Sequence, residues 1–398
     1  MSFRTLDDLP GDLDGKAALV RVDFNVPMAD GAVTDDTRLR AALSTIEKLR
    51  AKNASVILLS HFDRPKGKRV PSMSLQPLVE PLSKLLGITV SFGTDCIGPA
   101  AHEAVAAAGA GSVTLLENVR FHPGEEADDA DFIAELAQNG DLYVNDAFST
   151  AHRAHASTEG LAHVLPAYAG ESMRRELDAL EAALGSPKRP VLGVVGGSKV
   201  SSKLALLDNL VGKLDRLAIG GGMANTFLAA QGIDVGASLC EHDLAETARE
   251  IMATAKAAGC ELLLPVDVVT AKAVEPGIDH QVRALDAIQP DDMILDAGPR
   301  TAAALKAAMD ASATVIWNGP LGVFEVPPFD VATVDVARHA AALAKAGKLV
   351  AVAGGGDTVA ALNAAACTDD FTFVSTAGGA FLEWMEGKTL PGVAALAQ

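Results

Sequence analysis

Short apolar runs, each followed by a glycine-rich or polar turn, recur along the whole chain. In the first part they predict buried strands at 16–24, 55–60, 113–116 and 141–148. In the second part the comparable runs are 190–195, 216–219, 262–267, 294–299, 314–318, 349–353 and 372–376. Continuous apolar runs of this length are typical of parallel strands covered by helices on both faces. We therefore predict an α/β fold with two Rossmann-like three-layer domains, each with a parallel sheet, joined by a helical hinge.

The charged segment 171–181 marks the expected boundary between the two halves. Its pattern predicts an amphipathic helix that ends near 185–187, where Gly, Ser and Pro follow one another. We expect an N-terminal domain over 1–170, a connecting segment over 171–188 and a C-terminal domain over 189–387.

The glycine triplet 354–356 lies between a strand and a helix. Three glycines let the backbone come close to a ligand, and the free amides of the following helix favour an anion. Asp357 adds a carboxylate at the rim, which would repel a phosphate unless a divalent cation lay between them, so this residue indicates Mg²⁺. The alternative is that Asp357 only caps the helix.

Further turns of this kind occur at 196–203 and 220–227. Lys199 and Lys203 are four residues apart, so we expect them on one face of a helix, where a bound polyphosphate would offset their repulsion. The chain contains neither a Walker A loop nor a G-x-G-x-x-G fingerprint. So many glycine-rich strand-to-helix turns predict a nucleotide cleft lined by backbone.

The first half carries cationic side chains after its strands instead. Arg38 opposes the helix dipole in the first turn of a predicted helix that continues to about Arg50, which favours a ligand role over a solvated surface arginine. The other members of this expected basic cluster are His61, Arg64, Arg120 and Arg153. Guanidinium groups match phosphate and carboxylate geometry, so a small, multiply anionic metabolite is predicted. A metal pair of His152 and His155 is disfavoured, because no carboxylate or cysteine completes it.

Composition narrows the class of partner. The formal net charge of −18 argues against nucleic acid or an acidic membrane surface. The four cysteines are far apart, so the sequence suggests neither a zinc site nor a disulfide framework. The first residues lack an apolar core and no run approaches membrane-spanning length. We therefore expect a soluble cytoplasmic protein that acts on small molecules.

In order along the chain, these motifs resemble the phosphoglycerate kinase family. The resemblance covers essentially the whole sequence and rests on RVDFNVP at 21–27, HFDRPKG at 61–67, ENVRF at 117–121, AHRAHAS at 151–157, GGSKVSSK at 196–203, GGGMANTF at 220–227, WNGPLGVFE at 317–325, GGGDT at 354–358 and GKTLPGVAAL at 387–396. It implies reversible, Mg²⁺-dependent phosphoryl transfer between 1,3-bisphosphoglycerate and ADP, which gives 3-phosphoglycerate and ATP in glycolysis and gluconeogenesis. It also implies a monomeric hinge-bending enzyme whose C-terminal tail, about 388–398, packs on the N-terminal domain.

On the substrate side, the resemblance implies that Asp23 and Asn25 bind the glycerate hydroxyl and carboxylate region. Arg38 would meet the transferring phosphoryl group. The non-transferring phosphate would be held by His61, Arg64, Arg120 and Arg153, and the substrate site would also include Phe24, Phe62 and Asp63.

On the nucleotide side, the resemblance implies that Lys199 meets the transferring group and that the amides of Gly378 and Gly379 lie near it. Asp357 would bind Mg²⁺ and Glu325 the ribose hydroxyls. The phosphates and the rest of the nucleotide would contact Lys203, Gly221, Asn318, Gly355, Gly356 and Thr358.

Several positions depart from the family pattern. At 61–64 the family usually reads His-Leu-Gly-Arg, whereas this chain has His-Phe-Asp-Arg. Asp63 tolerates left-handed backbone, which is expected to preserve the turn, but its negative charge beside an anion-binding loop is expected to weaken substrate binding. Ala377 and Phe381 replace smaller residues near the last glycine turn, which affects the local fit there. Two other readings stay open: a non-catalytic sensor with this fold, and a different α/β phosphotransferase that acts on a carboxylate.

Overall fold

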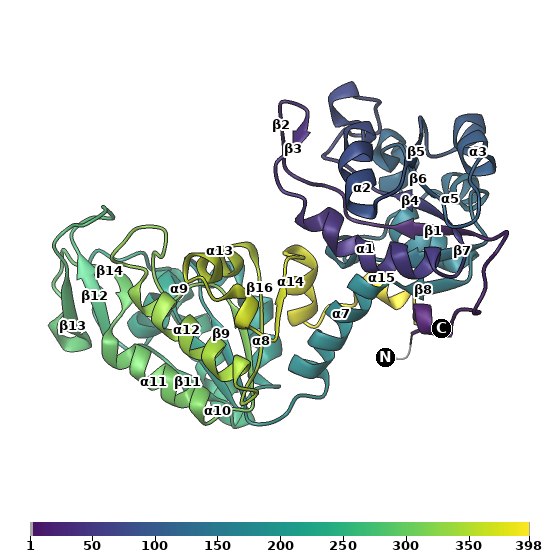
Figure 1. The fold of residues 1–398 in the computed structure, drawn as a ribbon. Helices are drawn as coiled ribbons and strands as arrows, with labels where there is room; N and C mark the ends of the chain where they lie inside the picture. The colour runs from purple at the N-terminus through teal and green to yellow at the C-terminus, as the bar shows by residue number, and fades with distance from the viewer. Residues whose placement is uncertain (1–2, 398) are drawn as a thin grey trace. The chain divides into compact units, whose positions relative to one another are not determined.

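A computed structural model describes residues 3–397, which form two compact α/β units (Figure 1). The first unit contains the chain up to Leu177 together with the residues from Thr389 onward, and the second contains Asp178–Lys388. Helix α7 (Glu171–Leu180) includes the boundary between them.

The first unit is built on a six-stranded sheet within the described residues, in the order β5-β6-β4-β1-β7-β8. All neighbouring strands are parallel. The strands are β1 (Ala17–Arg21), β4 (Ser55–Leu59), β5 (Val90–Gly93), β6 (Val113–Leu116), β7 (Leu142–Asn145) and β8 (Ala167–Ala169). A small hairpin consists of β2 (Met28–Ala29) and β3 (Ala32–Val33). The helices are α1 (Thr37–Arg50), α2 (Val79–Leu86), α3 (Gly98–Ala106), α4 (Pro123–Glu126), α5 (Ala130–Ala137), α6 (Leu161–Val164) and α15 (Pro391–Ala394).

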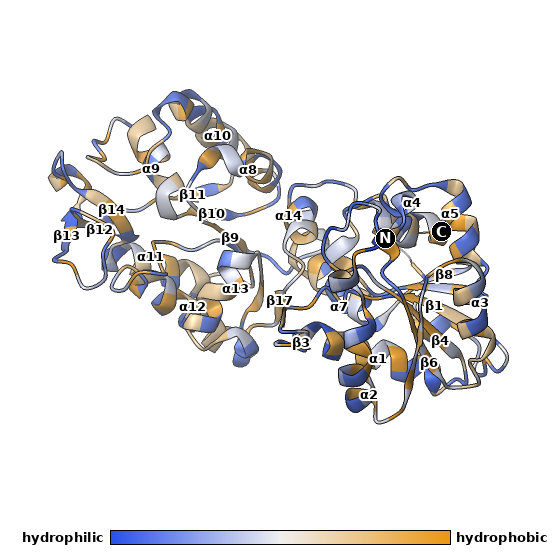
Figure 2. Ribbon diagram, turned by 90° about the horizontal axis from the view of Figure 1, so that it is seen from above, coloured by the Kyte–Doolittle hydropathy of each residue, from blue (hydrophilic) through white to orange (hydrophobic). Residues whose placement is uncertain are grey.

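Burial on both sheet faces explains the uninterrupted apolar runs, which Figure 2 shows as orange strands. Ala18 and Val20 of β1 pack in one core with Leu39 and Ile46 of α1. Leu19 points to the opposite face, as the two-residue period of a strand requires, and it is also fully buried. The helix predicted to continue to about Arg50 is confirmed as α1.

The second unit repeats this plan. Its six-stranded parallel sheet, counted over the described residues, has the order β11-β10-β9-β15-β16-β17. The strands are β9 (Val191–Val195), β10 (Arg216–Ile219), β11 (Glu261–Leu263), β15 (Thr314–Asn318), β16 (Val350–Gly354) and β17 (Phe373–Ser375). The helices are α8 (Leu204–Val211), α9 (Gly221–Ala230), α10 (Ala245–Ala258), α11 (Pro299–Asp310), α12 (Val331–Lys345), α13 (Gly356–Ala364) and α14 (Gly379–Met385). Helices α11 and α12 share one core with β9, β15 and β16.

One part of the second unit differs from the prediction. The runs 262–267 and 294–299 were expected to continue the parallel series, but only the first enters it, as β11. β14 (Met293–Ala297) pairs antiparallel with β12 (Asp267–Ala271), which also pairs antiparallel with β13 (Gln281–Ala284). This separate small sheet forms the left end of Figure 1.

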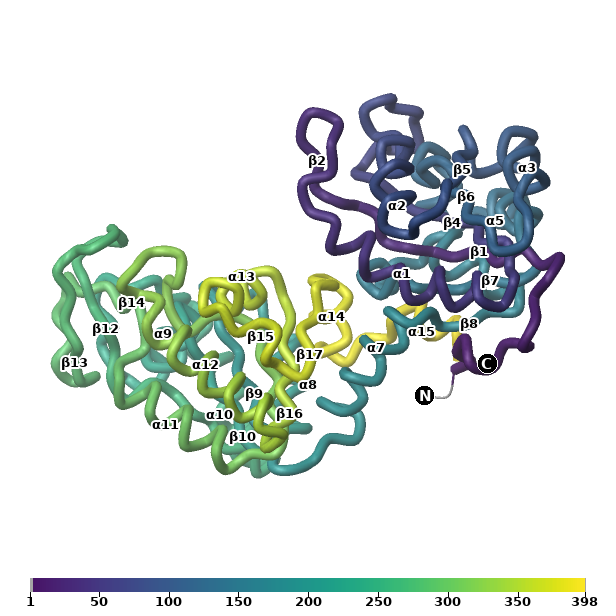
Figure 3. Tube along the Cα trace, viewed as in Figure 1, coloured from purple at the N-terminus to yellow at the C-terminus, as the bar shows by residue number. Residues whose placement is uncertain are grey.

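The end of the chain packs within the first unit. The amide of Gly392 in α15 donates to the carbonyl of Ala151 at 2.9 Å, and Asn145 Nδ2 donates to the Gly392 carbonyl at 3.4 Å. Figure 3 traces this yellow segment back to the purple and teal elements of the first unit. Among residues 3–397, the structure contains no helix long and apolar enough to cross a membrane.

Candidate functional site

Strand register brings the polar loops of the first unit to one edge of its sheet. Arg21, at the end of β1, pairs with Leu59 of β4 and with Asn145 of β7. Because neighbouring parallel strands end together, the loops after them emerge side by side. This edge therefore holds the candidate residues from 23–25, 61–64 and 149–153.

Arg38 is held at this edge by two acceptors. Its Nη1 donates to the Asn25 carbonyl at 2.7 Å and lies 3.1 Å from Asp23 Oδ2. Ser149 donates to the same carboxylate at 2.5 Å. The Arg38 side chain is 37% exposed, so the guanidinium group is positioned but still open to a ligand.

The loop after β4 is fixed through its backbone. Asn118 accepts from the Phe62 amide at 3.2 Å and donates to the Phe62 carbonyl at 2.8 Å. Asn25 Oδ1 accepts from the Asp63 amide at 2.9 Å. Asp63 adopts φ 53°, so the left-handed turn predicted for it is present, and its side chain is exposed.

His61 is a buried neutral donor. Burial lowers its pKa well below the ordinary value, and the charges of Arg21, Arg120, Arg153 and Arg38 lower it further. Arg21 Nη2 lies 3.1 Å from His61 Nδ1, and a guanidinium group can only donate. Nδ1 is therefore the acceptor, and the proton of the neutral ring is on Nε2, where it can be donated to an anion.

Among the arginines of this cluster, the charged form of Arg120 is the one most disfavoured by burial. Its side chain is 4% exposed, and burial, followed by the charges of Arg153 and Arg21, lowers its pKa to about 10. Nη1 donates to the Asp63 carbonyl at 2.9 Å, and Nε, which has no hydrogen-bond partner among residues 3–397, forms an ion pair with Glu126 Oε1 at 3.4 Å. A desolvated cation beside other cations is stabilised by a bound anion.

The remaining two arginines differ in their surroundings. Arg153 is half-buried, and its Nε donates to His152 Nε2 at 3.2 Å. Arg64 is exposed, and its side chain makes no hydrogen bond or ion pair within residues 3–397. The structure thus brings His61, Arg38, Arg120 and Arg153 together, whereas Arg64 projects from the same loop into solvent.

In the second unit, a chain of polar contacts connects three neighbouring strand ends. Lys203 donates to Asn318 Oδ1, and Asn318 Nδ2 donates to the Gly354 carbonyl at 2.8 Å. Thr358 accepts from the Gly319 amide at 2.7 Å. Burial lowers the pKa of Lys203, against the opposing effect of Asp357 and Glu386.

Two glycines are required by the backbone at this edge. Gly355 precedes α13 with φ 101°, and a Cβ there would lie 2.6 Å from Asn318 Nδ2. Gly221 begins α9 with φ 66°, and a Cβ would lie 2.7 Å from the Gly197 carbonyl oxygen. Side chains at either position would be strained and would clash.

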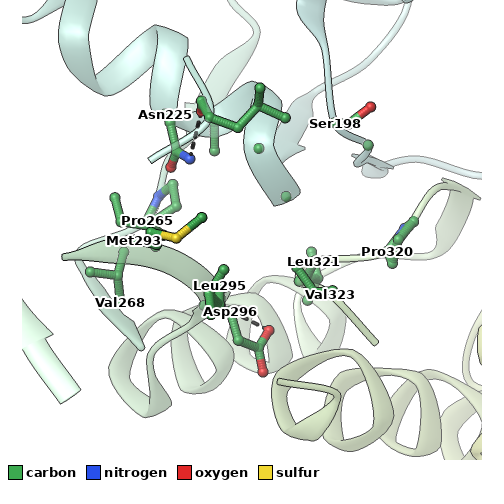
Figure 4. A pocket seen from close by; sticks show the side chains of 18 of the residues that line it. Ser198, Asn225, Pro265, Val268, Met293, Leu295, Asp296, Pro320, Leu321 and Val323 are labelled. Carbon is green, nitrogen blue, oxygen red and sulfur yellow. Dashed lines mark hydrogen bonds between the residues drawn. The ribbon is translucent and has the colours of Figure 1, made fainter. Parts of the chain in front are cut away.

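A cavity of about 470 Å³ opens beside Gly221. Figure 4 shows Leu321 and Val323 on one side of it and Met293 on the other. The lining residues that bear on a ligand are Gly221, Leu239, Val268, Leu295, Glu325 and Asp357. Its volume and its mostly apolar walls suit an aromatic base, and polar groups lie at its rim.

The remaining predicted residues lie at the carboxyl edge of the sheet or in the turns after it. Asp357 is exposed in the first turn of α13, and Glu325 is exposed at the cavity. Gly378 has φ 51° directly before α14, which begins at Gly379. Phe381 is fully buried in that helix and contacts Gly354, so the large side chain is accommodated where Gly354 has none.

Comparison with known proteins decides the family. The sequence profile described as "PGK: Phosphoglycerate kinase" matches residues 6–388. The chain belongs to the phosphoglycerate kinase family.

Relatives and solved structures agree with this assignment. Phosphoglycerate kinase from Caulobacter vibrioides (strain NA1000 / CB15N) is 72% identical, with 100% of both chains covered. The enzyme from Rhizobium meliloti (strain 1021) is 61% identical, also with 100% of both covered. The structure of phosphoglycerate kinase from Coxiella burnetii superposes with a TM-score of 0.93 at 41% identity, covering 100% of this chain and 99% of that one.

These findings confirm the predicted family, fold class and enzyme class. The chain is a phosphoglycerate kinase-family phosphotransferase with a carboxyl group as acceptor, and the family reaction is reversible transfer between 1,3-bisphosphoglycerate and ADP.

The expected helical pairing of Lys199 and Lys203 is wrong. Lys199 has extended backbone before a 3₁₀ turn at Val200–Ser202, and α8 begins only after Lys203. Lys199 is exposed, whereas Lys203 is drawn inward to Asn318. The two ammonium groups therefore do not stack on one helical face.

Sequence reasoning missed the residues that support both sites. Arg21 is fully buried, and it orients His61. An arginine inside an apolar strand was an available signal, because a buried charge needs partners. The apolar walls of the nucleotide cavity, such as Leu239 and Met293, carried no local signal that could have identified them.

Proposed function

We propose that the cationic cluster of the first unit binds the glycerate substrate and that the glycine-lined edge of the second unit binds the nucleotide. This proposal rests on the group of cations around His61 and Arg120, whose charges, together with burial, lower the pKa values of these two residues. Such a cluster is unfavourable without an anion and suits a phosphorylated carboxylic acid.

Within the first site, the non-transferring phosphate meets His61 Nε2–H and the guanidinium groups of Arg120 and Arg153, with Arg64 closing over it from solvent. Asp23 and Asn25 receive the glycerate hydroxyl and carboxylate region, where Phe24, Phe62 and Asp63 complete the surface. Arg38, anchored by Asp23 and the Asn25 carbonyl, faces the transferring phosphoryl group.

Within the second site, the cavity beside Gly221 takes the adenine base and Glu325 the ribose hydroxyls. Lys203, Asn318 and the amides of Gly355, Gly356 and Thr358 hold the phosphates at the N-terminus of α13. Lys199 and the amides of Gly378 and Gly379 meet the transferring group from the nucleotide side.

The chemistry requires no general base. The carboxylate of 3-phosphoglycerate and the terminal phosphate oxygen of ADP are already ionised at neutral pH. What the residues supply is alignment of donor and acceptor and neutralisation of the charge on a metaphosphate-like transition state. Arg38, Lys199 and the glycine amides provide these donors, and their effect increases as water is excluded.

The residues present fit a magnesium-bound nucleotide. Asp357 is an exposed carboxylate in the first turn of α13, and its side chain makes no hydrogen bond or ion pair within residues 3–397. Hard oxygen ligands of this kind suit Mg²⁺, which would supply positive charge beside the nucleotide phosphates. Asp357 is the residue of this chain that we assign to it.

Transfer brings two ligands into contact, so we propose hinge-bending closure as the step that completes the site. We further propose that the enzyme acts as a cytoplasmic monomer on small molecules alone, with nucleic acid and membranes excluded as partners.

The test is ATP turnover with 3-phosphoglycerate, with and without Mg²⁺, compared with acetate and other carboxylic acids. We expect turnover that needs both 3-phosphoglycerate and Mg²⁺. Binding of both ligands without turnover would indicate a sensor, and preference for another acid would indicate a different phosphotransferase.

A further inference from the structure

Three side chains with metal-ligating atoms meet in the first unit outside the sites described above. Asp95 and Cys96 follow β5, and His122 lies between the turn Val119–Phe121 and helix α4. One ligand atom of each lies within 4.8 Å of the ligand atoms of the other two. The proposed chemistry of the enzyme uses none of them.

Neighbouring residues hold two of these groups in place. His122 Nε2 lies 2.7 Å from Asp95 Oδ1, and the imidazole stacks on Phe132 with ring centroids 5.3 Å apart. Asn139, which is buried, donates through Nδ2 to the Cys96 carbonyl at 3.1 Å. Phe132 thus fixes the plane of the imidazole and Asn139 the backbone of Cys96, whereas a bound metal would replace the His122–Asp95 hydrogen bond.

A hollow of about 500 Å³ lies against His122 and opens to solvent. Its wall includes Phe132 and the carboxylate-bearing residues Asp129, Asp131 and Glu135. A concave surface lined by one sign of charge raises the local concentration of counter-ions. Cations are therefore concentrated beside the imidazole.

We propose that Asp95, Cys96 and His122 form a site for Zn²⁺ or a similar thiophilic divalent cation, with water from the hollow as fourth ligand. A thiolate, an imidazole and a carboxylate are zinc ligands, whereas Mg²⁺ requires six oxygens. Zinc–ligand bonds of about 2.0–2.3 Å in tetrahedral geometry place ligand atoms roughly 3.3–3.8 Å apart. The His122 and Asp95 atoms, which are 2.7 Å apart, would therefore separate by about 0.6–1.1 Å on binding, whereas a pair near the 4.8 Å limit would approach by roughly 1.0–1.5 Å.

One neighbouring cation competes with the metal. Arg69 Nη1 lies 3.6 Å from Asp95 Oδ2, and its Nη2 lies 3.8 Å from Glu117 Oε2. Arg69 is more than half exposed, but its Nη2 also donates to the Thr94 carbonyl at 2.7 Å, so the guanidinium group gives up this hydrogen bond if it withdraws into solvent. Removing the charge of Arg69 should increase the affinity for the metal, because the guanidinium group repels a cation. If the three side chains bind no metal, this substitution cannot produce such an increase.

The experiment uses Co²⁺ as a spectroscopic probe on the full-length, chelator-treated and reduced enzyme, without nucleotide. We expect one Co²⁺ per chain, a thiolate-to-cobalt charge-transfer band in the near ultraviolet, and displacement by Zn²⁺ but not by Mg²⁺. Cys96→Ser should abolish the band. Asp95→Asn should weaken binding by roughly tenfold or more, and Arg69→Gln should strengthen it.

The matched control addresses a second thiol–imidazole pair. Cys240 Sγ lies 3.6 Å from His242 Nδ1 in the second unit, so Cys240→Ser must leave the band unchanged. Loss of the band in Cys240→Ser, its survival in Cys96→Ser, or its absence from the wild type would each overturn the proposal. Because Cys96 is fully buried and its variant could misfold, Asp95→Asn serves as the second test, and unchanged affinity in that variant would equally overturn it.

Discussion

Replacing Arg120 with Met should raise the free energy of unfolding of the ligand-free enzyme and lower its affinity for 3-phosphoglycerate. The guanidinium group is 4% exposed, and burial, followed by the charges of Arg153 and Arg21, lowers its pKa from the ordinary arginine value to about 10. At about 1.4 kcal/mol per pKa unit, this difference corresponds to a penalty of about 3 kcal/mol on the charge. Met removes the charge and keeps a similar apolar volume.

The variant also loses the hydrogen bond to the Asp63 carbonyl and the ion pair with the half-exposed Glu126, which together contribute about 1–2 kcal/mol. The free energy of unfolding of the first unit should therefore rise by about 1–2 kcal/mol. Loss of charge-assisted hydrogen bonds to the substrate, at about 2–3 kcal/mol, should weaken 3-phosphoglycerate binding roughly 30- to 150-fold.

Native-state hydrogen exchange of the β1, β4 and β6 amides reports the stability of the first unit, and calorimetric titration reports the affinity. Arg40→Met is the matched control, because Arg40 is exposed and, within residues 3–397, its side chain pairs only with Asp36, the N-cap of α1. Its stability should change by less than about 0.5 kcal/mol. A clear loss of stability in Arg120→Met, or an affinity within threefold of the wild type, would refute the electrostatic reasoning.

Three further predictions concern pH, backbone and metal. Burial, followed by the charges of Arg120 and Arg153, lowers the pKa of His155 to about 4 in the folded chain. Between about pH 6.5 and 4 the unfolded chain therefore binds a proton that the folded chain does not. The contribution of His155 to the free energy of unfolding is constant above about pH 6.5 and falls on acidification through this range, by about 3 kcal/mol in total. Unfolding of the first unit, measured at several pH values, should therefore depend less on pH in His155→Gln, and equal slopes would contradict this. Gly221→Ala should weaken ADP binding, whereas Gly232→Ala, with φ 86° but nothing within 4 Å of the added Cβ, should lose stability alone; equal ADP affinities in the two variants would count against the backbone argument. Asp357→Asn should weaken ADP binding roughly tenfold or more in the presence of Mg²⁺ and leave metal-free ADP binding unchanged or stronger, as calorimetry can show; identical losses in both conditions would argue against the metal assignment.

The parallel sheets and their glycine turns were predictable because each rests on local chemistry. A strand buried on both faces must be apolar throughout, and φ 101° at Gly355 demands the residue found there. Asp63 is a similar case, since its left-handed backbone follows from the turn it occupies.

The antiparallel sheet and the arrangement of Lys199 were not predictable in this way. An apolar run such as β14 shows that a strand is buried, but its partner is chosen by tertiary packing. The spacing of Lys199 and Lys203 matches a helix, yet the chain turns at Val200–Ser202 before α8 starts. Zinc ligands at 95, 96 and 122 likewise share no spacing motif, because the fold alone joins them.

The central claim is that Arg38 stabilises the transferring phosphoryl group from the substrate side. Rapid-quench measurement of phosphoryl transfer in Arg38→Ala, with ADP affinity determined on the same preparation, tests it directly. We expect a transfer rate lowered roughly a hundredfold or more, while ADP binding stays within about twofold of the wild type. A transfer rate and an ADP affinity that fall by the same factor would contradict it.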